Sequence, residues 1–176
     1  MSKTYRVRLG SVRGEGRDER RIVCPKLVPE MPALLGDALA AKGWVVTPDG
    51  AKARKRFGTV DATIALDEPA LELKAEASVE LIGRSYEPND NDGLGRTAAL
   101  ADGETQRPVA AKQAVARAER IIAQAEPDVR AEVLGAVQVA LLEALQRKAA
   151  QLGRVQSVER GTDADGRAVT TIKVEV

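Results

Sequence analysis

The sequence contains no histidine, and its 176 residues include a single cysteine, Cys24. Without histidine, the chain cannot build a Ser-His-Asp or Cys-His catalytic arrangement, a histidine general base or a histidine-ligated metal site. One thiol excludes an intrachain disulfide, a cysteine-rich zinc site and an iron–sulfur cluster. We therefore expect no catalytic residue, no bound metal and no cofactor.

Aromatic residues and long apolar runs are also scarce. Aromatic side chains make up 2% of the sequence, so the core must be aliphatic and a base-stacking sheet for nucleic acid is not expected. No apolar run approaches the ~20 residues that span a bilayer. The N-terminal residues lack the apolar core of a signal peptide. Together with the lone thiol, which fits a reducing compartment, these features predict a bacterial cytoplasmic protein.

Charge is balanced overall but unevenly distributed. The formal net charge is +1, yet residues 1–60 hold 13 basic and 6 acidic side chains, whereas residues 61–104 hold 3 basic and 11 acidic ones. The basic residues gather in two stretches, 10–21 and 52–56, which are predicted to be loops. Such clusters can bind the phosphate groups of a polyanion. The candidate anion-binding residues are Arg13, Arg17, Arg20, Arg21, Lys52, Arg54, Lys55 and Arg56.

The N-terminal half of the sequence is predicted to be mostly β-structure. Alternation of apolar and polar residues predicts strands, and helical spacing of leucines before Gly43 predicts one helix. Glycine and arginine over residues 10–20 predict a hairpin loop, and residues 51–57 are interpreted as a basic connection. The expected strands are 4–9, 21–28, 44–46, 59–66 and 71–83, the expected helix is 32–42, and a turn is expected at Pro48-Asp49-Gly50.

The C-terminal half is predicted to contain two helices and a hairpin. Residues 88–108 are rich in Gly, Asp and Asn without an apolar period, which indicates a mobile loop. Helices are expected over 109–125 and 128–152, with Pro127 at the start of the second. Their expected buried faces are Ala111, Val115, Ala118, Ile122 and Ala125, and Val133, Val137, Ala140, Leu141, Ala144, Leu145 and Leu152. Asp165-Gly166 marks the turn of a final β-hairpin.

This element order predicts an α+β fold. A largely antiparallel sheet is expected, with helices packed on one face and a C-terminal β-hairpin. The chain is interpreted as a single α+β domain, residues 1–176, with the mobile loop at 88–108 as its one long excursion.

Three local patterns resemble functional motifs without meeting their requirements. Residues 93–98 match a dinucleotide-binding glycine pattern, but an acidic loop precedes them where a buried strand is needed. Residues 89–93 and 163–166 resemble calcium loops, yet neither places oxygen donors at the first and twelfth positions. Cys24 shares an apolar strand with Ile22, which favours a buried structural thiol over a reactive one.

One stretch of the sequence resembles a known family. Residues 34–46, LLGDALAAKGWVV, followed by Val60-Asp61-Ala62-Thr63-Ile64, are similar to small uncharacterised α+β proteins in which a short helix ends in Leu-Gly-aromatic and a Val-Asp strand follows. This chain has Lys-Gly-Trp instead. Such proteins occur in cyanobacteria and plastids, and related domains occur in bacterial three-component systems built around an FtsH-like or MoxR-like AAA+ ATPase. The resemblance implies a non-enzymatic partner or adaptor of an ATPase and supplies no catalytic residues.

Three functional hypotheses follow from the sequence. The first is a non-enzymatic interaction or adaptor module with a protein partner, in line with the AAA+ ATPase system that the resemblance implies. The alternative is a nucleic-acid- or polyanion-binding domain that uses the basic stretches 10–21 and 52–56. A third hypothesis is an enzyme that uses carboxylates such as Asp61, Asp67 and Glu72, but no pattern in the sequence brings them to one pocket.

Overall fold

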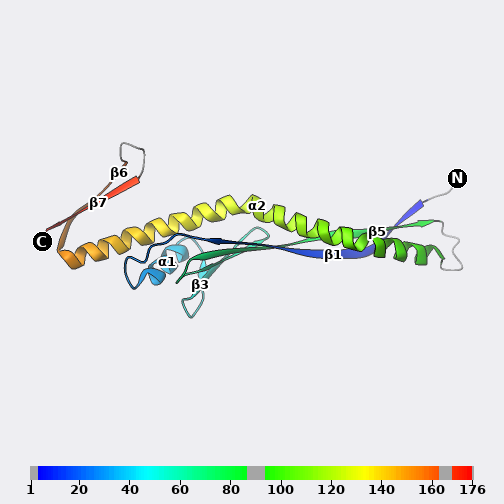
Figure 1. The fold of residues 1–176 in the computed structure, drawn as a ribbon, viewed down its shortest axis with the longest axis horizontal. Coiled ribbons are helices and arrows are strands. Elements are labelled where there is room, and N and C mark those ends of the chain that lie inside the picture. Colours follow the sequence, from blue (N-terminus) through cyan, green and yellow to red (C-terminus); the bar gives the residue numbers. More distant parts are fainter. Residues whose placement is uncertain (1–3, 87–93, 163–167, 176) are drawn as a thin grey trace. The chain divides into compact units, whose positions relative to one another are not determined.

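The computed structural model describes residues 4–86, 94–162 and 168–175 (Figure 1). Seven strands and two helices lie in these ranges. The helices are α1 (Met31–Ala40) and α2 (Leu94–Leu152). The strands are β1 (Thr4–Arg21), β2 (Val45–Val46), β3 (Lys52–Phe57), β4 (Val60–Ala65), β5 (Ala70–Tyr86), β6 (Arg154–Thr162) and β7 (Ala168–Glu175).

The strands form two sheets. A five-stranded sheet has the order β1-β5-β4-β3-β2, and β6 pairs with β7 in a separate two-stranded hairpin. The pairs β2–β3 and β6–β7 are antiparallel, with Val46 opposite Ala53 and Val158 opposite Ile172. A two-residue turn with a positive φ of 60° at Gly58 joins β3 to β4, which glycine adopts without strain. The predicted α+β class, antiparallel sheet and C-terminal hairpin are confirmed.

The chain divides into two compact units. The first comprises Met1–Asp18, Arg56–Asp61 and Leu73–Glu126, and the second comprises Glu19–Lys55, Ala62–Glu72 and Pro127–Val176. Within α2 the boundary falls between Glu126 and Pro127. The prediction of two helices separated at Pro127 is wrong, because α2 is continuous, but the same proline marks the change from one unit to the other.

Glycines in the strands of the first unit allow α2 to pack very close to the sheet. A Cβ added at Gly14 would lie 2.6 Å from the backbone carbon of Ala114, and one added at Gly16 would lie 3.0 Å from that of Ala118. At Gly83 of β5, a Cβ would lie 2.8 Å from the carbonyl oxygen of Ala99. Real Cβ contacts are longer than this, so only glycine fits at these strand positions without displacing the helix.

The buried face of α2 in the first unit consists mainly of alanine. Its members recur at four-residue spacing near the middle of this segment, as helical geometry requires for one face. They are Ala99, Ala110, Ala114, Ala118 and Ile122. The expected face is correct at Ala118 and Ile122 but wrong at Val115, which is exposed, while Ala111 and Ala125 are only half-buried. Alanine replaces the larger side chains because the close approach to glycine leaves no room for them.

The second unit has its own aliphatic core. The buried side chains of α1 are Met31, Leu34, Leu35, Ala38 and Leu39. Buried residues of the adjoining strands and of α2 include Trp44, Ala53, Ile64, Leu71, Val129, Val133, Ala136, Val137, Ala140 and Ala144. The expected stripe is confirmed at Val133, Val137, Ala140 and Ala144. Leu141 is half-buried, and the prediction is wrong at Leu145 and Leu152, which are 39% and 67% exposed.

Four predicted elements differ from the structure. Residues 10–20 are not a hairpin loop but the continuation of β1, and residues 22–28, expected as a strand, lie outside any strand. The basic connection 51–57 is largely β3, and residues 94–108, expected as a loop, belong to α2. The predictions for α1, β2, β4 and β5 are confirmed within a few residues. The predicted Asp165-Gly166 turn and the start of the predicted loop, 88–93, lie outside the described residues.

Candidate functional site

The structure places all eight candidate anion-binding residues on strands rather than loops. Four lie on β1 and four on β3. The β1 residues are Arg13, Arg17, Arg20 and Arg21, and the β3 residues are Lys52, Arg54, Lys55 and Arg56. Because side chains alternate between the two faces of a strand, Lys55 lies on the opposite face of β3 from Lys52, Arg54 and Arg56. On β1, Glu15 and Glu19 alternate with Arg13, Arg17 and Arg21 along one face.

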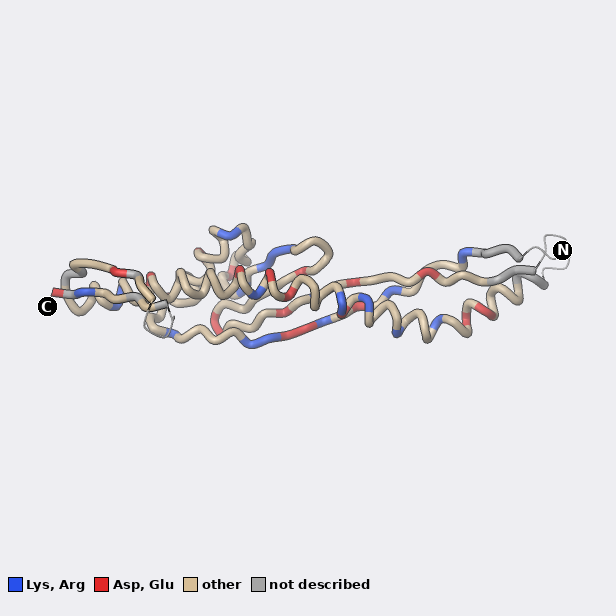
Figure 2. The backbone as a smooth tube through the Cα atoms, turned by 90° about the horizontal axis from the view of Figure 1, so that it is seen from above, with Lys and Arg blue, Asp and Glu red and all other residues tan. Residues whose placement is uncertain are grey.

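In the first unit, charges of both signs share the face of the sheet opposite α2. Arg13, Glu15 and Arg17 are exposed there, alternating with the glycines that contact the helix. The Nε of Arg17 donates a hydrogen bond of 2.7 Å to Glu15, and this bond lowers the pKa of that carboxyl. Arg56 lies 3.7 Å from Asp61. The mixture of basic and acidic positions along the chain is visible in Figure 2. This face therefore offers a phosphate group little net positive charge.

Lys55 of β3 has a structural role in the second unit. Its Nζ donates to the carboxylate of Glu132 on α2 and to the carbonyl oxygen of Lys42, both at 2.6 Å. The indole N–H of Trp44 donates to the same Glu132 oxygen at 2.6 Å. Burial raises the pKa of Glu132, but hydrogen bonds from Lys55 and Trp44 outweigh it, so the net pKa is below the ordinary value. Lys55 thus ties β3 to α2 rather than facing a ligand.

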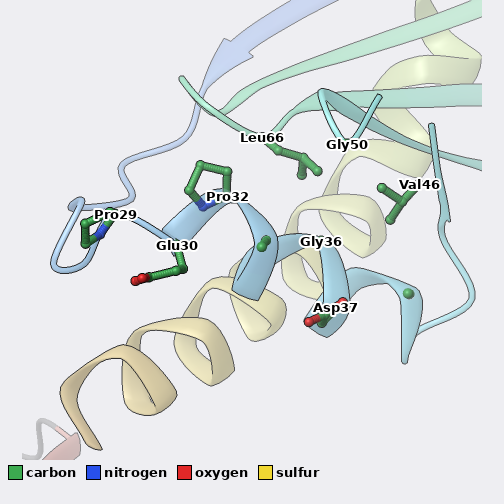
Figure 3. Close-up of a pocket in the computed structure, with 10 residues that line it drawn as sticks. Pro29, Glu30, Pro32, Gly36, Asp37, Val46, Gly50 and Leu66 are labelled. Atoms are coloured by element: carbon green, nitrogen blue, oxygen red, sulfur yellow. The ribbon is translucent and has the colours of Figure 1, made fainter. Parts of the chain in front are cut away.

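An apolar pocket of the second unit lies beside α1 (Figure 3). It is a pocket of about 550 Å³, which we call the α1 pocket. Its walls come from the segment before α1, the exposed side of α1, β2, the turn after β2 and the residue after β4. The lining residues are Pro29, Glu30, Pro32, Ala33, Gly36, Asp37, Ala40, Val46, Gly50 and Leu66. Volume and lining are typical of binding pockets, which range from roughly 300 to 1,000 Å³.

The local sequence explains this shape. Pro32 lies in the first turn of α1, where a missing N–H costs no helical hydrogen bond. Gly36 brings the helix close to the sheet, because an added Cβ would lie 3.3 Å from Leu66 and 3.8 Å from Val46. In Figure 3 both of these side chains point toward Gly36. Gly50 has a positive φ of 66°, which closes the turn that forms one wall.

The polar groups of the α1 pocket are acidic. Among the described residues that line it, Glu30 and Asp37 carry a charge, and both are exposed. Asp49 precedes Gly50 in the adjoining turn, where its carboxylate accepts hydrogen bonds from the Thr47 hydroxyl and the Ala51 N–H. The hydrogen bond from Thr47 contributes most to lowering the pKa of Asp49, which is therefore ionised at neutral pH. The pocket combines an apolar floor with a negative rim.

Comparison with models of known protein families places this chain in a family. The model of a family described as FtsH ternary system domain X5 matches residues 1–176. The chain belongs to this family. The match supports the three-component part of the resemblance stated above and carries no link to cyanobacteria or plastids. No curated protein and no solved structure matches the chain significantly.

The remaining candidate reactive residues are half-buried or lie beside a basic side chain. Cys24 is half-buried, and burial raises the pKa of its thiol, so it is less reactive than an ordinary cysteine. Asp67 pairs with Lys26 at 2.7 Å, and Asp61 lies near Arg56. In the ranges that the structure describes, no three metal-ligating side chains cluster, and no helix is long and apolar enough to cross a membrane.

The sequence did not predict the α1 pocket, although it predicted α1 and its end before Gly43. The available signal was Gly36, a glycine inside a helix that otherwise favours alanine and leucine, because such a glycine often marks a close approach. The other walls come from residues 46–66, whose proximity depends on the tertiary fold.

Proposed function

We propose that this chain is a non-enzymatic interaction module that acts as an adaptor in an FtsH-associated three-component system. The family match over residues 1–176 is the observation that carries the proposal. An adaptor needs a stable scaffold and a surface for another protein, but no reacting groups. The aliphatic cores and the α1 pocket meet these requirements.

We propose the α1 pocket as the site where the module binds its protein partner. Protein interfaces depend on a few anchor residues buried in pockets and surrounded by a polar rim. The α1 pocket has this arrangement, with Leu66, Val46 and Pro32 below and Glu30 and Asp37 at its edge. The AAA+ ATPase of the system is the partner that we expect.

Polyanion binding has less support from the geometry. Arg17, Lys55 and Arg56 are each within ion-pairing distance of a carboxylate. The interleaved acidic residues on β1 repel the same ligand. Lys52 and Arg54 are exposed on β3, but two cations support at most weak, salt-sensitive binding.

Affinity purification from the native host tests the proposal. The tagged full chain is compared with Ala33→Glu, whose longer polar side chain on the pocket wall obstructs the apolar interior, at a helical position that is exposed. Ala131→Glu on the exposed side of α2 is the matched control. We expect quantitative mass spectrometry to recover the ATPase or another component of the system with the native chain and the control, and far less with Ala33→Glu.

Equal recovery with both variants would refute the α1 pocket as the docking site. Recovery of nucleic acid, or of no system component with the native chain, would refute the adaptor proposal itself. Circular dichroism of each purified variant shows whether a lost partner reflects binding rather than unfolding.

A further inference from the structure

We infer that the α1 pocket binds an extended protein segment that inserts an aliphatic side chain and carries Lys or Arg beside it. This inference rests on the proposed docking role of the pocket. It goes further because it specifies the chemistry of the bound segment, which three features of the pocket determine.

The first feature is the apolar interior. Pro32, Val46 and Leu66 present only carbon side chains, and Ala33 and Ala40 add methyl groups from α1. A polar side chain placed here would lose its hydration without a side-chain partner from these residues, which costs free energy. An aliphatic side chain gains about 25 cal/mol for each Å² of apolar surface that it buries. The interior therefore selects an aliphatic group.

The second feature is the charge of the rim. Among the described residues, Glu30 and Asp37 are the charged groups that line the pocket. Ionised Asp49 flanks Gly50, and the positive charge of nearby Lys52 partly offsets it. The exposed Asp67 follows Leu66, but Lys26 already pairs with it. A bound segment therefore meets a net negative field, which favours a basic residue and disfavours an acidic one. The same field argues against a phosphate group or another anion as the occupant.

The third feature is the edge of the five-stranded sheet. β2 is its last described strand on this side. The N–H of Thr47 donates to the carbonyl of Lys52 on β3, and Val45 lies opposite Arg54. Because hydrogen-bonding direction alternates along an antiparallel strand, the N–H and C=O of Val46 are directed away from β3.

Neighbouring contacts place this edge beside α1. The N–H of Trp44, which has the same direction as that of Val46, donates to the carbonyl of Leu39 at the end of α1. This hydrogen bond joins Trp44 to α1, and two residues further on Val46 lines the α1 pocket. A strand added here would exchange backbone hydrogen bonds with Val46 while an adjacent side chain enters the pocket.

A phage-displayed library of random heptapeptides, selected on the purified full chain, tests the inference. Phage that also bind the Ala33→Glu variant are removed. We expect the remaining peptides to share an aliphatic residue with Lys or Arg within two positions. A synthetic peptide of the most enriched sequence is then titrated by calorimetry against the native chain and its variants.

Three results are expected from this titration. Asp37→Lys weakens binding by about two- to fivefold at low ionic strength, the effect of one exposed ion pair. Replacing the aliphatic residue of the peptide by Ser weakens binding by about tenfold or more, a change of about 1.4 kcal/mol. N-methylation of the peptide residue that faces Val46 weakens binding, whereas N-methylation of the neighbouring peptide residues has little effect.

Other outcomes overturn the inference. Enriched peptides that are acidic would contradict the charge argument, and uniform tolerance of N-methylation would contradict strand addition. Failure to enrich any pocket-dependent peptide would exclude a linear segment as the occupant. If affinity purification still shows partner loss with Ala33→Glu in that case, the docking role stands and only the inferred chemistry of the partner is wrong.

Discussion

Replacing Gly14 by alanine is expected to destabilise the first unit through a steric clash with α2. The new Cβ would lie 2.6 Å from the backbone carbon of Ala114 and 2.9 Å from its Cβ, whereas ordinary contacts are 3.4–4 Å. The helix backbone must therefore retreat by up to about 1 Å, which forfeits roughly a quarter to a half of the local dispersion energy. Overpacking of this kind costs about 1–3 kcal/mol. Removing a strand glycine returns about 0.5–1 kcal/mol, so the net loss lies between about 0 and 2.5 kcal/mol, with a middle value of about 1 kcal/mol.

Urea denaturation followed by far-ultraviolet circular dichroism measures this loss. Gly16→Ala is expected to show a smaller effect, because its nearest backbone atoms would lie 3.0 Å away. Gly161→Ala on β6 is the control, because beyond its chain neighbours no atom lies within 4 Å of the added Cβ, so we expect only the gain of about 0.5–1 kcal/mol from removing a strand glycine. The reasoning is refuted if Gly14→Ala unfolds at the same urea concentration as Gly161→Ala, or if Gly16→Ala is the more damaging of the two β1 variants.

Three further predictions concern the second unit. Glu132→Ala should lower the free energy of unfolding by about 1.5–3 kcal/mol, because Lys55 and Trp44 lose their charged acceptor. The folded-state pKa of Glu132 is depressed, so the stabilisation from its carboxylate is present above pH 4.5 and is lost as the pH falls further. The free energies of unfolding of the native chain and of Glu132→Gln should therefore converge in acid, and a difference that stays constant with pH would contradict this. Leu141→Ala should cost about 1–2 kcal/mol in urea denaturation, less than a fully buried leucine, and a larger loss would show deeper burial. Arg54→Glu should leave binding of a single-stranded oligonucleotide weak near 150 mM salt by fluorescence anisotropy, as in the native chain; tight, salt-resistant binding of the native chain would revive the polyanion hypothesis.

Elements with a clear apolar period could be predicted from the sequence. In β5 the buried Leu71, Leu73 and Ala75 alternate with charged residues, and in α1 the leucines recur at helical spacing. Both patterns reflect one buried face, which local sequence is sufficient to encode. The final hairpin followed from two alternating segments around a turn signal.

The central part of β1 could not be recognised, because its buried positions are glycines. Gly14 and Gly16 resemble loop residues until their contact with α2 is known. Exposed charged residues, Arg13, Glu15 and Arg17, alternate with these glycines. The two-residue period of a strand was therefore present, but no apolar residue marked its buried face.

The length of α2 was missed for a related reason. Pro108 and the small residues before it indicated a loop, yet residues 94–108 are helical. Proline inside a helix costs about 3 kcal/mol, an amount that local propensity cannot offset. Packing of Ala99, Ala110 and Ala114 against the strands can offset it, and such packing is not visible in the local sequence.

The surroundings of the candidate anion-binding residues could not be predicted from the sequence. Lys55 was grouped with its neighbours by sequence, whereas the strand directs it inward to Glu132. The α1 pocket likewise depends on Leu66 and Val46 approaching Gly36, a contact between residues that are distant in the chain.

Photo-crosslinking in the native host tests the central claim most directly. A photoreactive phenylalanine analogue is placed at residue 33 on the wall of the α1 pocket and, as a control, at exposed residue 131 on α2. We expect residue 33 to crosslink to a protein component of the FtsH-associated system and residue 131 not to do so. Crosslinks to that component from residue 131 alone, or none from residue 33 while the partner still co-purifies, would contradict docking at the α1 pocket.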